Sequence, residues 1–340
     1  MNLVHRLVAA LLVIPALAHR APAADAQPKE PSDKLFLWKV TPRAGKNVAY
    51  LLGSIHAGSR DFYPLPDEIE DAFDECQVLA VEVDLAAQDQ EALQQLVTDK
   101  GVYGGNDTLA RHLPRATYEA VEKYSGALGL PASLVDRLRP WAVNVLITML
   151  EAQKAGLKPE LGIDQHFLNA AKQGVGKDKK AVAELESAED QLGLLASFPD
   201  KQQAELLAAT LEGVGAGAGG AKEGVEKIVE AWKAGDEGGM HRLTAADPVK
   251  KRPALKPVFQ KLVDDRNVTM AKKIEDYLKS RKSHFVVVGA GHLSGPNSIP
   301  RLLQKRGYKV EQVQRKAVEP DAAPAEPAPA KGSRRVTVPQ

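Results

Sequence analysis

Two copies of Gly-x-x-His follow short apolar runs, and they constrain the fold more than any other feature of the chain. The first is Gly53-Ser-Ile-His56, after residues 48–52, and the second is Gly289-Ala-Gly-His292, after residues 285–288. A buried strand that ends in a glycine turn delivers the following side chains to the carboxyl edge of a sheet, where ligand sites of open α/β folds gather. We therefore expect the two histidines to meet at one site.

Both motifs continue through a proline-containing loop into a helical stretch and a second β-rich run. The helical stretches are residues 67–74 and 301–306, and the β-rich runs are residues 78–83 and 308–313. This pattern predicts an α/β (α+β) fold in which two pseudo-symmetric β-loop-α-β units form a central sheet. Between them, apolar residues recur at three-to-four spacing. We therefore predict a large helical insertion over about residues 86–282.

The two ends of the chain differ in composition from the rest. Residues 1–26 combine a basic start, an apolar stretch and A-x-A sites, which predicts a signal peptide and a periplasmic or secreted protein. The apolar stretch is shorter than the roughly 20 residues of a spanning helix, so we expect no membrane span in the mature chain, with an uncleaved anchor as the alternative. We expect a linker at 27–34, one domain at 35–315, and a disordered Pro/Ala-rich tail at 316–340.

Charge and motif content narrow the range of functions. The net charge is +1, with no dense basic stretch inside the apparent fold, so we expect no nucleic-acid partner. The chain has neither a Gly-x-Ser-x-Gly elbow nor a His-Glu-x-x-His helix, so the common serine-hydrolase and zincin mechanisms lack support. The expected partner is a peptide or small-molecule substrate, and the oligomeric state is open.

Glu82 completes a candidate metal site with His56 and His292. It stands between Val81 and Val83 in an otherwise apolar run, and a buried carboxylate is costly without a partner. Two neutral imidazoles and one carboxylate form a three-ligand set that leaves room for water, and zinc is one metal that such a set binds.

Candidate substrate-binding residues surround this set. Gly53, Gly289 and Gly291 lack a Cβ atom, so substrate or metal can approach the backbone closely. Asp164 is a candidate substrate or supporting residue, although it is equally suited to cap the helix that follows it. Arg266 and Asn267 together offer donors for a substrate carboxylate or carbonyl, with an ordinary charged helix face as the alternative.

Several short motifs resemble the TraB/GumN family, which also includes plasmid pheromone-shutdown proteins and the animal Tiki proteases. The resemblance covers nearly all of residues 35–313, in the family's order. It rests on these motifs: Leu37-Trp38, Tyr50-Leu-Leu-Gly-Ser-Ile-His56, Val81-Glu82, Pro140-Trp141, Gly162-Ile-Asp164, Asp265-Arg-Asn267 and Val288-Gly-Ala-Gly-His-Leu293.

The resemblance implies a metal-dependent hydrolase core built from the two Gly-x-x-His motifs and a glutamate after the first, which here are His56, His292 and Glu82. Tiki members are described as manganese- or cobalt-dependent proteases, so manganese or cobalt is the implied cofactor. The first motif reads Gly-Ser-Ile-His where Gly-Thr-x-His is common in the family.

Two functions remain open. In the first, the chain is an exported hydrolase in which metal-activated water attacks a carbonyl, Glu82 is a ligand or general base, and Arg266 stabilises charge. In the second, the same pocket is a non-catalytic periplasmic module that sequesters a peptide or signal. A role in exopolysaccharide assembly rests on the family name alone and has no residue-level support.

Overall fold

The computed structural model describes residues 33–43, 46–174, 179–215 and 220–316. The predicted signal peptide, most of the predicted linker and nearly all of the predicted tail lie outside these residues. Within the described ranges, no helix is both long enough and apolar enough to cross a membrane.

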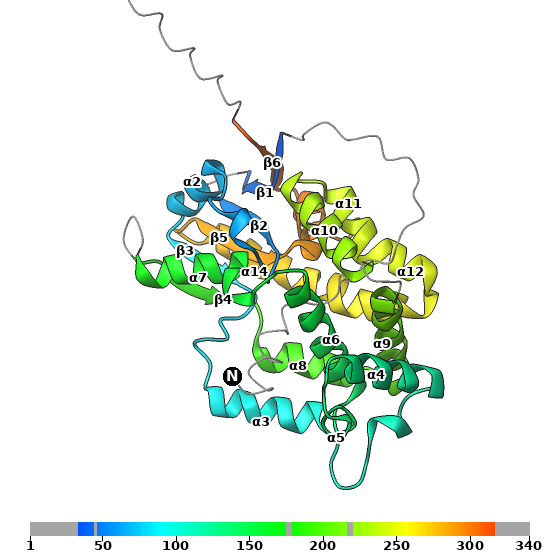
Figure 1. Cartoon of the computed structure of the whole chain (residues 1–340). Helices are drawn as coiled ribbons and strands as arrows, with labels where there is room; N and C mark the ends of the chain where they lie inside the picture. Colours follow the sequence, from blue (N-terminus) through cyan, green and yellow to red (C-terminus); the bar gives the residue numbers. More distant parts are fainter. Residues whose placement is uncertain (1–32, 44–45, 175–178, 216–219, 317–340) are drawn as a thin grey trace, which may run out of the picture.

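A six-stranded mixed sheet forms the centre of the fold, in the order β4-β3-β5-β2-β1-β6 (Figure 1). The mixed sheet and its helices confirm the predicted α/β (α+β) class. The strands are β1 (Lys34–Thr41), β2 (Ala49–Ser54), β3 (Val78–Val81), β4 (Ala181–Glu184), β5 (His284–Gly289) and β6 (Lys309–Gln314).

The two predicted units interleave within this sheet. The first unit contributes β2 and β3, and β5 of the second unit lies between them, parallel to both. Strand β6 pairs with β1, which in turn pairs antiparallel with β2. Ser54 at the end of β2 is in register with Gly289 at the end of β5. The two histidine motifs therefore leave the sheet at the same edge.

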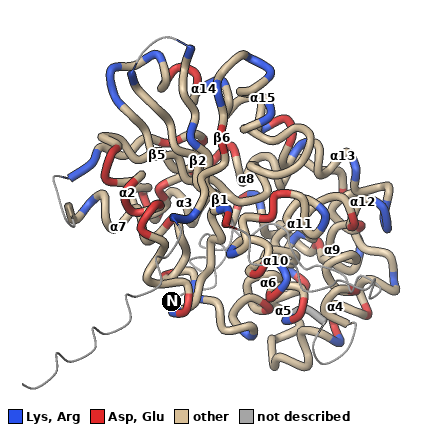
Figure 2. The backbone as a smooth tube through the Cα atoms, turned by 90° about the horizontal axis from the view of Figure 1, so that it is seen from above, with Lys and Arg blue, Asp and Glu red and all other residues tan. Residues whose placement is uncertain are grey.

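The central strands are buried on both faces, which explains their continuous apolar sequences. Every residue of β2, β3 and β5 is buried, as expected when helices cover a parallel sheet on both sides. The helices that pack around the sheet include α2 (Asp67–Glu75), α7 (Ile163–Gln173), α14 (Arg266–Lys279) and α15 (Ile299–Lys305). Figure 2 shows the acidic residues that gather on α2.

A second hydrophobic core contains residues of helices and connecting segments, with none from the sheet strands. At its centre lies α6 (Pro140–Lys154), which is apolar nearly all round and buried along most of its length. The other helices of this region and its border with the sheet are α3 (Gln90–Gly101), α4 (Arg115–Ala127), α5 (Ala132–Val135), α8 (Ala188–Ser197), α9 (Asp200–Gly215), α10 (Gly220–Lys233), α11 (Glu237–His241), α12 (Asp247–Lys251) and α13 (Lys256–Phe259).

The structure differs from the sequence expectations in two places. The predicted helical insertion contains a strand, β4, which pairs in parallel with β3. This strand was missed because it is only four residues long and not fully buried, so it lacks a strong apolar pattern. In addition, β3 ends at Val81, so Glu82 lies just beyond the strand rather than within it.

Candidate functional site

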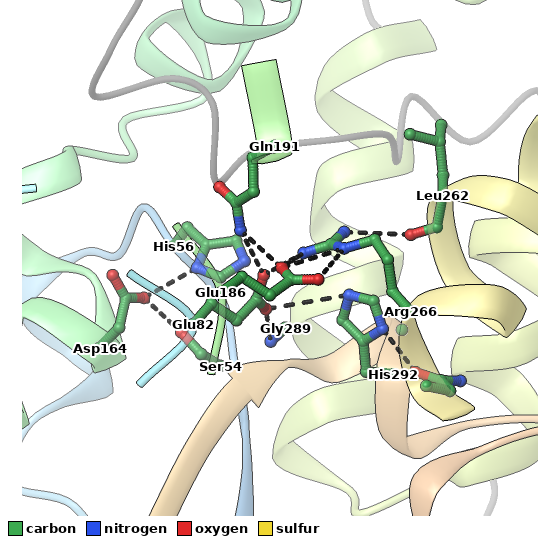
Figure 3. Close-up of polar contacts among 12 residues, drawn as sticks. Ser54, His56, Glu82, Asp164, Glu186, Gln191, Leu262, Arg266, Gly289 and His292 are labelled. Atoms are coloured by element: carbon green, nitrogen blue, oxygen red, sulfur yellow. Dashed lines mark hydrogen bonds and ion pairs between the residues drawn. The ribbon is translucent and has the colours of Figure 1, made fainter. Parts of the chain in front are cut away.

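The candidate site lies at the carboxyl edge of the parallel strands, where the sheet faces the helical region. His56 follows β2 by two residues, Glu82 follows β3 directly, and His292 lies in η7 (Ala290–Leu293), directly after β5. The structure therefore brings the two predicted histidines and the predicted glutamate together (Figure 3).

Asp164 fixes His56 from behind. Its Oδ1 lies 2.9 Å from His56 Nδ1 and accepts a hydrogen bond of 2.5 Å from the Ser54 hydroxyl. Asp164 is buried in the first turn of α7, so the carboxylate reaches the histidine from the opposite side to Glu82. With Nδ1 donating to this carboxylate, His56 presents its Nε2 towards the sheet edge.

Asn267 fixes His292 in the same manner. Asn267 Oδ1 lies 2.6 Å from His292 Nδ1, and Asn267 Nδ2 donates to the Asn297 carbonyl at 2.9 Å. Because the amide nitrogen is used by Asn297, the atom that faces His292 is an acceptor, and Nδ1 of the imidazole must carry the proton. The Nε2 lone pair of His292 is therefore left free.

Glu82 lies between the two histidines. Its Oε1 accepts the backbone N–H of Gly289 at 2.7 Å and lies 3.9 Å from His292 Nε2. A Cβ atom built on Gly289 would lie 2.9 Å from His56 Nε2 and 3.4 Å from Glu82 Oε1. These two atoms therefore converge over the same glycine, which has no side chain to separate them.

A buried ion-pair network holds the other oxygen of Glu82. Arg266 Nη2 donates to Glu82 Oε2 at 2.6 Å and to Glu186 Oε2 at 2.5 Å. Gln191 Nε2 donates to the same two carboxylates at 3.1 and 3.0 Å. Arg266 also donates through Nη1 to the Leu262 carbonyl. The guanidinium thus bridges two carboxylates and fixes the orientation of Glu82.

The surroundings shift the pKa values of the three central groups in different directions. Burial alone would raise the pKa of Glu82, but Arg266 and the two histidines lower it to about 2. Burial, reinforced by Arg266, lowers the pKa of His292 to about 4. Burial alone would also lower the pKa of His56, but the charge and hydrogen bond of Asp164 raise it above its ordinary value. At neutral pH, Glu82 is therefore ionised and His292 is neutral.

The donor chemistry of these residues fits a divalent metal. Two atoms that bind one ion at about 2.1 Å are at most about 4.2 Å apart, and Glu82 Oε1 and His292 Nε2 are within that limit at 3.9 Å. The carboxylates of Glu82, Glu186 and Asp164 outnumber the single guanidinium of Arg266, so the local charge favours a cation. In the described parts of the chain, no group of three or more His, Cys, Asp or Glu side chains is placed to hold a metal ion, so these residues would hold one only if their side chains moved closer.

A cavity of about 390 Å³ opens from this cluster into the helical region. His56, Glu82, Arg266 and His292 line it at the sheet edge, and most of the remaining wall is apolar. Of the predicted substrate-binding residues, Gly289 and Gly291 line the cavity, and their contact with substrate stays a prediction. Gly53, Asp164 and Asn267 are not among its lining residues.

These three residues instead support the site from behind. Asp164 and Asn267 hold the histidines, and the Gly53 carbonyl accepts a 2.7 Å hydrogen bond from the Trp232 indole. A Cβ atom on Gly53 would approach the Phe36 ring to 2.4 Å. These residues therefore lie behind the histidines, as the supporting role expected for Asp164 requires, and contact of the three with substrate stays a prediction.

The sequence analysis missed Ser54, Glu186 and Gln191. Glu186 follows β4 by two residues, and the rule that directed attention to His56 and His292 would have found it if that strand had been recognised, whereas Gln191 lies further on, in α8. Ser54 lies inside the first motif, but the sequence contains no signal that its hydroxyl meets Asp164.

Comparisons with known proteins identify the family of the chain. The model of the TraB/PrgY/gumN family matches residues 36–312. The chain is 28% identical over 265 residues to the uncharacterized protein YbaP of Shigella flexneri and to YbaP of Escherichia coli K12, which covers 76% of this chain and 89% of each relative. It is 23% identical over 281 residues to an uncharacterized protein of Treponema pallidum, covering 81% of both chains.

No solved structure shows significant similarity to the chain. The family match includes both Gly-x-x-His motifs and extends over most of the sequence. The chain is therefore a member of the TraB/PrgY/gumN family, as the resemblance of its motifs predicted.

Proposed function

We propose that this protein is a divalent-metal-dependent hydrolase that acts on an amide or ester bond in a peptide or small molecule. One observation carries the proposal: two imidazoles turn their Nε2 atoms towards one carboxylate, while their Nδ1 atoms are held by Asp164 and Asn267. Metal-binding histidines usually have this arrangement, in which an outer acceptor fixes the tautomer and the ring orientation.

His56, His292 and Glu82 are the residues that would hold the metal. Manganese or cobalt is proposed on the family resemblance, and zinc on the ligand set. A bound divalent ion would lower the pKa of water towards neutrality and polarise a carbonyl oxygen. Glu82 is better suited to hold a cation than to act as a general base, because its pKa of about 2 makes it a weak proton acceptor.

Arg266 holds Glu82 in place and adds positive charge at the edge of the cavity. Three of its nitrogen atoms are engaged with Glu82, Glu186 and the Leu262 carbonyl. A direct contact with charge that develops on a substrate would require the guanidinium to leave one of these partners. Positioning of Glu82 is therefore the role that its contacts support, and charge stabilisation stays a prediction.

The proposal includes a periplasmic or secreted location and excludes nucleic acid as a substrate. The predicted signal peptide supports a periplasmic or secreted enzyme, and the near-neutral net charge argues against nucleic acid as a substrate.

One observation favours the alternative function, a non-catalytic module that sequesters a peptide or signal. Arg266 already pairs with Glu82 at 2.6 Å, and this ion pair neutralises part of the charge that a metal would need. In a protein that binds ligand without turnover, the same ion pair would serve as the polar end of the pocket.

Metal binding by the purified mature protein separates the two functions. Elemental analysis and calorimetry with manganese, cobalt and zinc would compare the wild type with the double variant His56→Ala, His292→Ala. His166→Ala is the control, because this histidine pairs with Glu70 outside the cluster. We expect one ion per chain in the wild type and the control and none in the double variant. Equal binding by all three proteins would refute the metal site, and no binding by any would favour sequestration.

A further inference from the structure

The wall of the cavity beyond the polar cluster is mostly apolar, although His241, Lys256 and Asp264 also line it. Five aliphatic residues on four helical segments line it, namely Leu194, Val225, Val229, Met240 and Leu262. The two threonines on the wall do not change this character, because Thr148 and Thr244 donate their hydroxyls to carbonyls of their own helices. We call this part of the cavity the aliphatic pocket.

Two π-helical segments form part of the same wall. Segment η4 (Arg242–Ala246) contributes Thr244 and Ala245, and segment η6 (Gln260–Asp265) contributes Leu262 and Val263. π-Helical turns are rare and occur frequently at functional sites, where they alter the direction of side chains. Segment η6 ends directly before Arg266, so one stretch of the chain contributes to both the pocket wall and the polar cluster.

A buried acceptor lies at the polar end of the pocket. Gln191 is 7% exposed, and its Nε2 is engaged with Glu82 and Glu186. Its Oε1 has no hydrogen-bond partner among the described residues. A buried acceptor without a partner is costly, and an N–H donor of an amide ligand is a group that would satisfy it after a small movement of the side chain.

We propose that the aliphatic pocket binds an aliphatic group of the substrate and places an adjacent amide at the polar cluster. The proposal rests on the proposed function for the reaction itself, whereas the binding preference stands on the pocket alone. Its volume of about 390 Å³ lies in the range of about 300–1,000 Å³ for small-ligand sites. A large aliphatic side chain of a peptide and a short acyl chain share this chemistry.

Calorimetry on the full mature chain in the presence of a chelator tests the binding preference without turnover. One arm uses N-acyl glycinamides from acetyl to octanoyl, and the other uses capped Gly-X-Gly peptides in which X is glycine, alanine, valine or leucine. We expect affinity to rise by up to about fourfold per added methylene until the pocket is filled. The arm with the steeper rise identifies the source of the aliphatic group.

The variant Val229→Phe fills the pocket, and Val268→Phe is its matched control. Val268 is 51% exposed on α14 and does not line the cavity. We expect Val229→Phe to abolish the dependence on chain length and Val268→Phe to retain it, with equal folding of both by circular dichroism. A flat series in the wild type, or a rise that persists in Val229→Phe, would overturn the proposal.

The result of the metal-binding experiment is independent of the dependence of ligand affinity on chain length. A chain-length dependence without metal binding would refute the hydrolase and retain the aliphatic pocket. Metal binding without any dependence of affinity on chain length would retain the hydrolase and refute the aliphatic pocket.

Discussion

The two Gly-x-x-His motifs resemble each other in sequence, yet the structure places them in opposite electrostatic surroundings. His56 in the first motif is held by a charged carboxylate, Asp164 on α7, whereas His292 in the second is held by a neutral amide, Asn267 on α14. Asp164 raises the pKa of His56 against the effect of burial, whereas burial and Arg266 lower the pKa of His292 to about 4. The same motif therefore carries histidines with different pKa values, because the charged groups around the two buried rings differ.

This difference bears directly on metal binding, because an imidazole must be neutral to act as a ligand. His292 satisfies this condition throughout the physiological pH range. His56 must lose a proton whose loss is opposed by Asp164, so metal affinity should rise with pH through the pKa of His56. If both histidines are ligands, the one in the second motif would be available at any physiological pH, whereas the one in the first would depend on pH.

Removal of each histidine separately should have the largest effect. If both are ligands, His56→Ala and His292→Ala should each weaken metal binding by roughly 3 kcal/mol, a factor of about 150. Calorimetry with manganese, cobalt and zinc measures this. An affinity in His56→Ala within about tenfold of the wild type would show that His56 is not a ligand.

Exchange of the acceptors behind the histidines should have the next largest effect. Asp164→Asn should lower the pKa of His56 and Asn267→Asp should raise that of His292, which NMR titration of the metal-free protein measures. Each change should weaken metal binding by about 10–100-fold, the usual effect of altering such a partner.

Ser54→Ala serves as the control for this exchange, because it removes the other hydrogen bond to Asp164 and leaves the carboxylate in place. Unchanged pKa values in both exchange variants would mean that burial alone sets the protonation of the two histidines.

The two glycines of the second motif should differ from each other. Gly289→Ala brings a Cβ atom within 2.9 Å of His56 Nε2, whereas a Cβ on Gly291 meets no atom within 4 Å. We expect Gly289→Ala to reduce the free energy of unfolding by about 1–3 kcal/mol, as overpacking does, and to displace His56 from the site. Urea unfolding and calorimetry measure both effects. Equal behaviour of Gly291→Ala would contradict the close approach at Gly289.

Stability against pH should distinguish the two histidines by the sign of the effect. The folded pKa of His292, about 4, lies below the unfolded value near 6.5, so the unfolded chain binds more protons between these pH values. The free energy of unfolding that His292 contributes should therefore fall as pH drops from about 6.5 to 4, by up to about 1.4 kcal/mol per pH unit.

His56 should behave in the opposite way. Because its folded pKa is raised, its contribution is present below pH 6.5 and is lost as pH rises through the folded value. Guanidinium unfolding of metal-free His56→Leu and His292→Leu, each compared with the wild type over pH 4.5–8, isolates the two contributions. Slopes of the same sign in both comparisons would contradict the assignment.

The sequence predicted the meeting of the two histidines because that meeting depends on strands with strong apolar patterns. Strands β2 and β5 are fully buried and end in register, so local sequence was sufficient to predict the shared edge. The partners behind the histidines were harder to predict. Asp164 was equally consistent with a helix cap, because no local pattern specifies which strand edge a helix N-terminus faces.

The ion-pair network was harder still. Glu186 and Gln191 depend on β4, a four-residue strand that is not fully buried and is recognisable only from its pairing with β3. Arg266 was identified as a candidate, but its two carboxylate partners lie 184 and 80 residues away in the sequence. Contacts of this kind depend on tertiary packing, which periodicity does not report.

The adjacency of β2 and β5 also affects how the protein must fold. Ala49 pairs with His284, so the central parallel pair joins segments that are more than two hundred residues apart. Such distant pairing is slow, since loop closure precedes any gain from the contacts. During synthesis, β2 can pair with β1, but its other edge remains open until β5 emerges, and an open strand edge promotes aggregation. Strand β5, which is synthesised late and completes the candidate site, is therefore also the strand that covers the open edge of β2.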